Sequence, residues 1–225
     1  LAAAGATAIL NLSASPFQLG KPEQRFEMLR DLAIRHGLPI HYCNAVGGND
    51  QLVFDGHSLS VNASGARLWQ GASFASETAL VDEAAPGPTL LSHRSTMQNL
   101  EAALVLGLRD YMAKCGFTTC VLGLSGGLDS AVTAAIAVSA VGAKNVTGVA
   151  MPSEYSSQHS IDDAFALAKN LGIRYEVIPI EPAFKTAEGQ LANVFAGTKP
   201  TEAEANIQSR SRGVTLMALS NKFRS

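Results

Sequence analysis

The chain has 225 residues, of which 47% are hydrophobic and 16% charged, and its formal net charge is -2. This composition is typical of a globular protein with a sizeable core and argues against a disordered chain. The small net charge argues against a basic surface that coats nucleic acid. No apolar run approaches the roughly 18 residues of a membrane span. We therefore expect neither a nucleic-acid partner nor a membrane partner.

Both ends of the chain look cut. Residue 1 is Leu1 and not Met, and Ser225 follows a helical pattern without a clear cap, so a fragment of a longer protein is the simplest interpretation. No basic segment precedes an apolar one at the start, which argues against a signal peptide. The three cysteines, Cys43, Cys115 and Cys120, lack CxxC spacing and predict free thiols in a reducing compartment. We therefore expect a cytoplasmic protein.

The first 80 residues combine strand patterns with one helix. In chain order the patterns predict a buried strand at 7–12, a loop at 13–20, a helix at 22–36 that ends at Gly37, and a strand at 38–45. Asp55-Gly56 separates two further strand patterns, 52–54 and 58–61. Because Asp-Gly suits a tight turn, these residues predict a β-hairpin.

Residues 81–96 hold Pro and Gly without periodicity and predict an interdomain linker. The remaining chain alternates between the two kinds of element. The patterns predict helices at 97–115, 128–141, 160–171, 183–194 and 202–222, and strands at 119–124, 146–151 and 174–180. This alternation predicts a parallel sheet with helices on both faces.

A glycine-rich loop, Ser125-Gly126-Gly127-Leu128-Asp129-Ser130, lies between a predicted strand and a predicted helix. The glycines let the backbone turn sharply and point its N–H groups inward, and the helix presents its positive end. The serines add hydroxyl donors, and the loop therefore predicts a phosphate site. Asp129 would repel a bare phosphate but could hold Mg²⁺ that bridges to it. The loop lacks the Lys of a Walker A motif and the dinucleotide GxGxxG spacing. A plain tight turn, with Asp129 entering the helix, is the alternative.

Ser-Gly-Gly-x-Asp-Ser resembles the motif of the ATP pyrophosphatases, which split ATP into AMP and pyrophosphate. Residues 151–157 and 206–222 are similar to glutamine-dependent NAD synthetase. Residues 5–21 and 42–56 resemble the nitrilase-type glutaminase domain of the same family. The resemblance covers nearly the whole chain and is weakest in the linker and at residues 66–80.

The resemblance implies an α/β fold in two parts. Residues 1–80 would be the C-terminal part of a nitrilase-like αββα sandwich, and residues 97–225 the N-terminal half of a Rossmann-like, adenine-nucleotide-binding domain. The implied activity is ATP-dependent amidation of deamido-NAD to NAD through an adenylated intermediate, with ammonia from glutamine. Another amidating synthetase of the ATP pyrophosphatase type, or a non-enzymatic nucleotide-binding module, remains the alternative.

The resemblance also implies site residues. ATP would contact Gly123, Leu124, Ser125, Gly126, Gly127, Leu128, Asp129 and Ser130. Glutamine would contact Ser15 and Lys21, deamido-NAD would contact Asn206 and Arg210, and Asp129 would hold Mg²⁺. The glutaminase Cys, Glu and Lys are expected upstream of residue 1, so we assign no catalytic residue to this chain and expect it to be inactive alone. The full-length protein is expected to be a homo-oligomer. A turn followed by a surface lysine is the alternative at Ser15 and Lys21.

Other polar residues have simpler interpretations. Three arginines of the helix at 22–36 alternate with acidic residues and predict a solvated face: Arg25, Arg30 and Arg35. His57 shows no metal-ligand spacing. Cys43 shares a strand face with His41, but no third orienting group is evident, so core packing is the better interpretation of Cys43.

The last predicted helix has two faces in our interpretation. Asn206 and Arg210 are four residues apart, so their side chains share one face and can reach one ligand. Ile207, Val214 and Ala218 are predicted to pack against the sheet from the other side. A solvated polar stripe is the alternative for Asn206 and Arg210.

Overall fold

The computed structural model describes residues 1–82, 94–199 and 201–225. The chain divides into two compact units, Leu1–Tyr111 and Met112–Ser225, which we describe separately. Most of the predicted linker, from residue 83 to 93, lies outside the described residues. None of the helices in the described ranges has both the length and the apolar character that crossing a bilayer requires.

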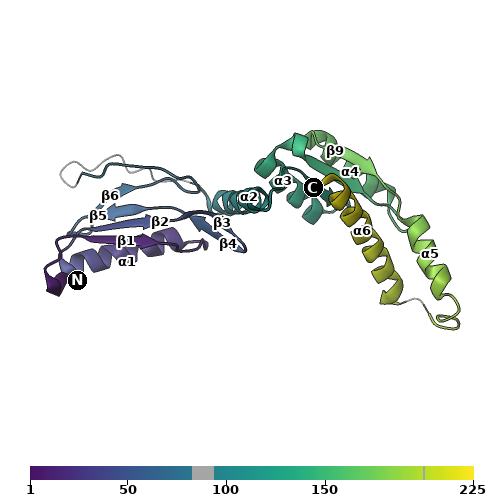
Figure 1. The fold of residues 1–225 in the computed structure, drawn as a ribbon, viewed down its shortest axis with the longest axis horizontal. Coiled ribbons are helices and arrows are strands. Elements are labelled where there is room, and N and C mark those ends of the chain that lie inside the picture. The colour runs from purple at the N-terminus through teal and green to yellow at the C-terminus, as the bar shows by residue number, and fades with distance from the viewer. Residues whose placement is uncertain (83–93, 200) are drawn as a thin grey trace. The chain divides into compact units, whose positions relative to one another are not determined.

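The first unit is built from a mixed sheet, one long helix and a small second sheet (Figure 1). After a short 3-10 helix at Ala2–Ala4, its elements are β1 (Ile9–Ser13), α1 (Lys21–His36), β2 (Ile40–Asn44), β3 (Val46–Asn49), β4 (Leu52–Asp55), β5 (Leu59–Val61) and β6 (Arg67–Gln70). The main sheet has the order β1-β2-β5-β6, with β1 parallel to β2 and the other pairs antiparallel. The strands β3 and β4 pair with each other.

Helix α1 covers one face of the main sheet (Figure 1). Its Leu29 and Ala33 are four residues apart, share a face, and pack against Ile40 and Leu59 in a cluster that is at least 95% buried. The helix ends at Gly37, whose φ of 63° gives the left-handed cap expected from the sequence. The predicted helix and both strands that flank it are therefore confirmed.

The other face of the main sheet carries exposed apolar side chains. Ile9 packs toward α1, whereas its neighbours on the opposite face, Leu10 and Leu12, are 75% and 85% exposed. Cys43 is also exposed, on the strand face that His41 shares. The strand prediction is confirmed, but the predicted burial of the first strand and of Cys43 is wrong for the described residues.

The predicted hairpin around Asp55-Gly56 is wrong. Strand β4 pairs with β3 in the small sheet, whereas β5 pairs with β2 and β6 in the main sheet. The partner strand β3 contains Gly47 and Gly48, which carry no side chains and so leave no alternating pattern to recognise. Asp55 thus ends a strand and is completely buried, instead of lying in an exposed turn.

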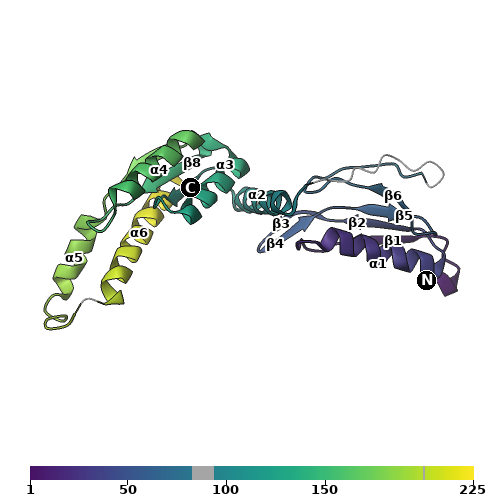
Figure 2. The ribbon, with the colours of Figure 1, turned by 180° about the vertical axis from the view of Figure 1, so that it is seen from behind.

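The second unit is an α/β layer with an all-parallel sheet of order β7-β8-β9 (Figure 2). Helix α2 (Thr96–Cys115) spans the division between the units, and the rest of the second unit consists of β7 (Cys120–Gly123), α3 (Leu128–Val141), a 3-10 turn (Ala143–Asn145), β8 (Val146–Ala150), α4 (Gln158–Leu171), β9 (Arg174–Val177), α5 (Glu181–Leu191) and α6 (Glu202–Phe223). Every element predicted here is confirmed, with boundaries shifted by a few residues.

Small side chains let the helices approach the parallel sheet. Ala134 and Ala137 of α3 are almost completely buried where that helix contacts β7 and β8. Helix α6 packs its Leu216 and Leu219 on Val149, which is fully buried in β8. The carboxyl ends of β7 and β8 therefore lie between well-packed helices.

The side of α6 predicted to face the sheet is wrong by about one residue of rotation. Ile207 is half-buried, but Val214 is 71% exposed and Ala218 is exposed. The inward stripe runs through Gln208 and Arg212 and then through the two leucines. Because two of its positions are polar, hydrophobic periodicity alone points to the wrong side of this helix.

Candidate functional site

A cavity of about 710 Å³ opens at the carboxyl ends of β7 and β8. Its walls come from residues 123–125, 150–152 and 155–157, from Ser160 and Ile161 of α4, and from Arg212 and Leu216 of α6. Ligands of parallel α/β sheets bind at this edge, where loops leave the strands. Of the residues predicted to bind ATP, Gly123, Leu124 and Ser125 line the cavity, and the others continue from it into α3.

The glycine-rich loop turns tightly against the first turn of α4. Gly126 has a φ of +79°, and a Cβ there would lie 2.3 Å from the Ser160 carbonyl oxygen and 2.7 Å from its Cα. Ser160 is held in turn by Ser157, whose hydroxyl caps α4 by accepting from the Ser160 N–H at 3.2 Å. Glycine is therefore required at this position both for its backbone conformation and for space.

Ser125 and Ser130 stabilise the turn itself. The Ser130 hydroxyl donates to the Gly127 carbonyl at 2.9 Å and accepts from the Ser125 N–H at 3.3 Å. The Ser125 Oγ accepts from the Gly127 N–H at 3.2 Å. Their hydroxyls, predicted as phosphate donors, thus form bonds within the loop. The donors left over at α3 are the N–H groups of its first turn, as at any helix N-terminus.

Asp129 lies in that first turn with an exposed side chain. Its backbone carbonyl accepts from the Thr133 hydroxyl at 2.8 Å, which is ordinary helix geometry. Within the described ranges, no cluster of three or more His, Cys, Asp or Glu side chains is arranged to hold a metal ion.

Asn206 and Arg210 do share one face of α6, as predicted. Arg210 Nη1 donates to Asn206 Oδ1 at 3.1 Å, and both side chains are exposed. The cavity lining from α6 comes instead from Arg212 and Leu216. Arg212 Nε donates to the Met151 carbonyl at 3.2 Å and so ties α6 to the end of β8.

Gln208 makes a second hydrogen bond between α6 and the segment after β8, since its Oε1 accepts from the Ser153 hydroxyl at 3.1 Å. Sequence reasoning missed both Gln208 and Arg212. The signal was present in the four-residue spacing of Gln208, Arg212 and Leu216, which places polar and apolar side chains on one inward stripe.

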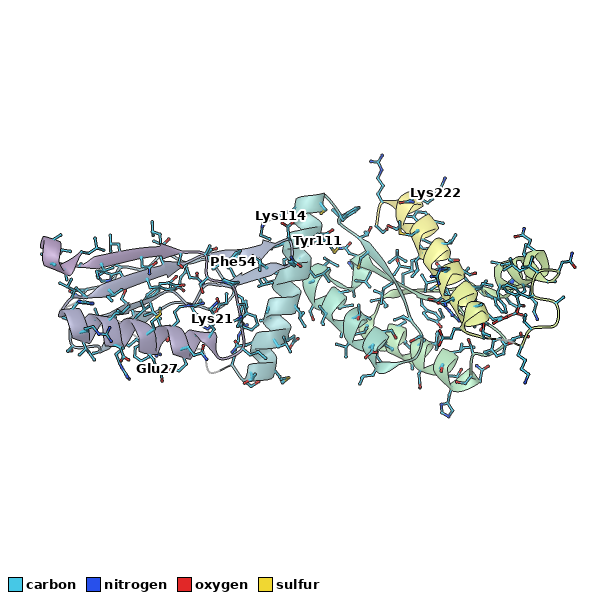
Figure 3. The ribbon with its side chains drawn as sticks, turned by 90° about the horizontal axis from the view of Figure 1, so that it is seen from below. Lys21, Glu27, Phe54, Tyr111, Lys114 and Lys222 are labelled. Atoms are coloured by element: carbon cyan, nitrogen blue, oxygen red, sulfur yellow. The ribbon has the colours of Figure 1, made fainter. Side chains whose placement is uncertain are left out.

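In the first unit, Ser15 and Lys21 lie at the two ends of the 15–21 loop, a segment that leads into α1 and is attached to β4. Lys21 Nζ donates to the Pro16 carbonyl at 3.0 Å, and Pro16 forms a β-bridge with Phe54. The Phe17 N–H donates to the Val53 carbonyl at 2.7 Å. Figure 3 shows Lys21 and Phe54 at the same end of this unit. The structure thus places the predicted glutamine-binding residues in one segment, which backbone contacts attach to β4.

Behind this loop lies a buried polar cluster that the sequence did not predict. Arg25 was expected in a solvated face but is only 4% exposed. The reason is helical spacing, since Arg25 shares the buried stripe of α1 with Leu29 and Ala33. Arg30, by contrast, is exposed as predicted and pairs with its neighbour on the surface.

Asp55 is the centre of the cluster. Its Oδ1 accepts from Arg25 Nη2 and from Asn44 Nδ2, each at 3.3 Å, and its Oδ2 pairs with His57 Nδ1 at 2.9 Å. Burial raises the pKa of Asp55, but the hydrogen bond from His57 and the charge of Arg25 outweigh burial and hold this pKa below its usual value.

This shift predicts a pH-dependent stability. Because folding lowers the pKa of Asp55, its charge stabilises the fold fully above the unfolded pKa of about 4, and this contribution disappears as pH falls through the folded pKa. The Asp55→Asn variant should therefore lose unfolding free energy at pH 7 and approach the unmodified protein as pH falls below about 4. Denaturant unfolding followed across this range measures the effect.

The exposed Asp31, paired with Arg30 on the surface, provides a control. Asp31→Asn should change the unfolding free energy by less than about 0.5 kcal/mol at pH 7. A deficit of Asp55→Asn that stays constant down to pH 2 would show that the ionised carboxylate contributes nothing.

Comparisons with known proteins agree with these features. The family model described as NAD synthase matches residues 100–225. The glutamine-dependent NAD(+) synthetase of Synechocystis sp. is 45% identical over 97% of this chain, and that of Rhodobacter capsulatus is 45% identical over 99%. The structure of glutamine-dependent NAD+ synthetase from Acinetobacter baumannii, in complex with adenosine diphosphate, is 37% identical and covers 99% of this chain with a TM-score of 0.91.

The chain spans only 40% and 42% of the length of the two curated relatives and 43% of the solved chain. The match to the family model nevertheless extends over more than half of the chain and includes the loop, the parallel strands and α6. The chain therefore belongs to the NAD synthase family.

Proposed function

We propose that this chain is part of a glutamine-dependent NAD synthetase, which amidates deamido-NAD to NAD with ATP and with ammonia released from glutamine. One observation carries the proposal. The Ser-Gly-Gly-Leu-Asp-Ser loop turns at the carboxyl end of β7, on the rim of a nucleotide-sized cavity, in a chain matched along nearly its whole length by such synthetases.

We propose a nitrilase-like part at residues 1–80, a linker at 81–96 and an adenine-nucleotide-binding part at 97–225. The exposed Leu10, Leu12 and Cys43 on one face of β1 and β2 support the first assignment, because one layer of an αββα sandwich must pack on a second sheet. The parallel β7-β8-β9 sheet supports the last, as half of a Rossmann-like sheet. We also propose that the full-length protein is a homo-oligomer.

ATP would occupy the cavity with its phosphates at the glycine-rich loop. The first turn of α3 offers N–H donors and a positive helix end to an anion. The relative from Acinetobacter baumannii was solved with adenosine diphosphate, which supports a nucleotide here. The loop would hold the departing pyrophosphate while the nicotinate carboxylate of deamido-NAD is adenylated. Ammonia would then displace AMP, a better leaving group than the oxygen of a free carboxylate.

The residues present fit a magnesium ion that is shared with the nucleotide. Mg²⁺ in such sites takes one or two protein carboxylates and fills its shell with phosphate oxygens and water. The exposed carboxylate of Asp129, in the first turn of α3 beside the glycine-rich loop, would supply one such ligand. The ion would neutralise charge that develops on the phosphates.

Glutamine would bind at the 15–21 loop of the first unit. The ammonium of Lys21 and the hydroxyl of Ser15 are donors suited to a carboxylate. Both lie in the segment that Pro16 and Phe17 fix to β4. Glutamine would then draw the Lys21 ammonium away from the Pro16 carbonyl by a movement of the side chain, and the backbone could stay in place.

Two arginines of α6 should affect different ligands. We assign deamido-NAD to Asn206 and Arg210, because an arginine fork and a neighbouring amide suit phosphate and ribose oxygens. Arg210→Ala should weaken deamido-NAD binding about tenfold to a hundredfold and leave ATP binding unchanged. Arg212→Ala should weaken ATP binding instead, because Arg212 lines the cavity and holds the end of β8.

Binding constants for both ligands, measured by calorimetry for both variants in the full-length protein, check this assignment. If Arg210→Ala changes neither affinity, Arg210 is a solvated surface residue. If each variant weakens both ligands equally, the two arginines serve one shared site or the fold.

The function itself is tested with a full-length protein that carries this chain. With ATP, Mg²⁺, deamido-NAD and either glutamine or ammonium, it should form NAD and one pyrophosphate per NAD. Another amidating synthetase would release pyrophosphate only with a different acceptor. A nucleotide-binding module would bind ATP and release none, and that outcome would refute the proposed activity.

A further inference from the structure

The buried guanidinium of Arg25 has more partners around the loop than packing alone would require. Its side chain is 3% exposed, and it donates to Ser15 Oγ at 3.3 Å, to Asp55 Oδ1 at 3.3 Å and to the Gly56 carbonyl at 3.4 Å. It also lies over the Tyr42 ring, 5.3 Å from the centroid. A buried ion pair stabilises a fold little compared with apolar side chains of similar volume. The arrangement around Arg25 is therefore better explained by the residues that its hydrogen bonds hold in place.

The cluster holds Ser15 at three points. Asn44 Oδ1 accepts from the Ser15 N–H at 2.8 Å, and Asn44 Nδ2 donates to the Ser15 carbonyl at 3.2 Å. Arg25 takes the third point, the hydroxyl oxygen. Asn44 is fixed in turn by Tyr42, whose hydroxyl donates to its Oδ1 at 3.1 Å. Backbone and side chain of Ser15 are thus set by groups that do not themselves lie in the loop.

The bond from Arg25 also fixes the role of the Ser15 hydroxyl. A guanidinium donates and cannot accept, so Ser15 Oγ accepts there and keeps its single proton for another acceptor. The positive charge of Arg25 draws electron density from Ser15 Oγ and makes the hydroxyl a stronger donor. The hydroxyl is therefore prepared to donate to an oxygen atom of a ligand, above all to a carboxylate.

We propose that Arg25, held by Asp55, is a positioning residue for glutamine binding, which presets the Ser15 hydroxyl as a hydrogen-bond donor to a glutamine oxygen. This inference rests on the proposed function, since Ser15 is a glutamine ligand only there. Asp55 has its second oxygen fixed by His57, so its first oxygen stays directed at Arg25. The cluster then acts through Ser15 without touching glutamine.

The test compares variants of a full-length protein that carries this chain, assayed with glutamine and with ammonium as nitrogen source. Arg25→Lys keeps the charge but loses the fork that reaches Ser15 and Asp55 together. It should raise the KM for glutamine about tenfold or more, as expected for losing one charged hydrogen bond, and leave ammonium-dependent kcat within about twofold. Arg30→Lys, on the exposed face of the same helix, is the matched control and should change neither value.

A double-mutant cycle separates positioning from mere structural support. If Arg25 acts through the Ser15 hydroxyl, Arg25→Lys should add nothing to the KM of Ser15→Ala. Additive effects, or equal losses with both nitrogen sources, would overturn the proposal. If Arg25→Lys does not fold, Asp55→Asn takes its place in the same cycle, because it keeps the shape and removes the charge that holds Arg25.

Direct glutamine binding keeps this test independent of the overall reaction. Glutamine affinity measured by calorimetry for the same variants should show the same non-additive pattern. An unmodified protein that binds glutamine but forms no NAD from either nitrogen source would refute the proposed function and leave the role of Arg25 intact. An unmodified protein with no glutamine affinity would overturn both.

Discussion

Replacing Asp129 with asparagine in a full-length protein should lower turnover about 10²- to 10³-fold, with glutamine and with ammonium alike. The exposed carboxylate lies in the first turn of α3, beside the loop proposed to hold the departing pyrophosphate. An amide of the same shape keeps the turn but removes the negative charge that would hold Mg²⁺ against the phosphates. Steady-state rates of NAD and pyrophosphate formation measure the effect.

Two controls separate this role from that of a helix-entry residue. A carboxylate near a helix N-terminus stabilises the helix by up to about 1 kcal/mol, so a purely structural Asp129 would change the melting temperature and leave turnover near normal. Asp163, exposed on α4, provides a variant with the same charge change away from the loop, and Asp163→Asn should leave the rate unchanged. Raising Mg²⁺ should restore the Asp129→Asn variant poorly, because the ligand itself is missing.

The fold of the second unit could be predicted because its signals are local. The strand before the glycine-rich loop, the helix after it and the capping glycine at 172 all lie within short stretches, and the structure confirms each. The hairpin predicted at Asp55-Gly56 failed because β4 pairs with the preceding strand β3 across residues 50 and 51, whereas β5 pairs with β2 and β6. The strand β3 contains two glycines, so its sequence has no alternating pattern, and the sequence of β4 does not show that β3 is its partner.

The candidate site also has one part that the sequence predicted and one part that it did not. The loop at 125–130 was visible as a motif, whereas the rest of the cavity is assembled by tertiary packing of α4 and α6. Arg25 and Arg212 were both missed because a charged residue inside a helical stripe usually faces solvent. Each is instead held inside by acceptors from distant segments, Asp55 for Arg25 and the Met151 carbonyl for Arg212.

Replacing Gly126 with alanine should weaken ATP binding and destabilise the protein, although the new side chain is a single methyl group. The residue has a φ of +79°, which costs an L-residue about 1–2 kcal/mol. The added Cβ would also lie 2.3 Å from the Ser160 carbonyl oxygen and 2.7 Å from its Cα, far inside van der Waals contact. Both obstacles are backbone atoms of α4, so no side chain can rotate away. The loop or the helix must shift, and each forms part of the cavity wall. We therefore expect ATP affinity to fall by at least about tenfold and the protein to be destabilised by about 2 kcal/mol or more.

Gly172 separates the clash from the backbone strain. It ends α4 with a φ of +67°, and a Cβ there would meet nothing within 4 Å. Gly172→Ala should therefore carry only the cost of the left-handed conformation, about 1–2 kcal/mol of stability, and leave ATP affinity unchanged. Calorimetric titration with ATP and thermal melting, applied to both variants, give the two quantities needed. If Gly126→Ala loses no more ATP affinity than Gly172→Ala, the close approach of the loop to α4 is not what shapes the site. If its affinity falls while its stability matches that of Gly172→Ala, the clash is relieved by moving the loop alone, and the phosphate-binding turn is the part that moves.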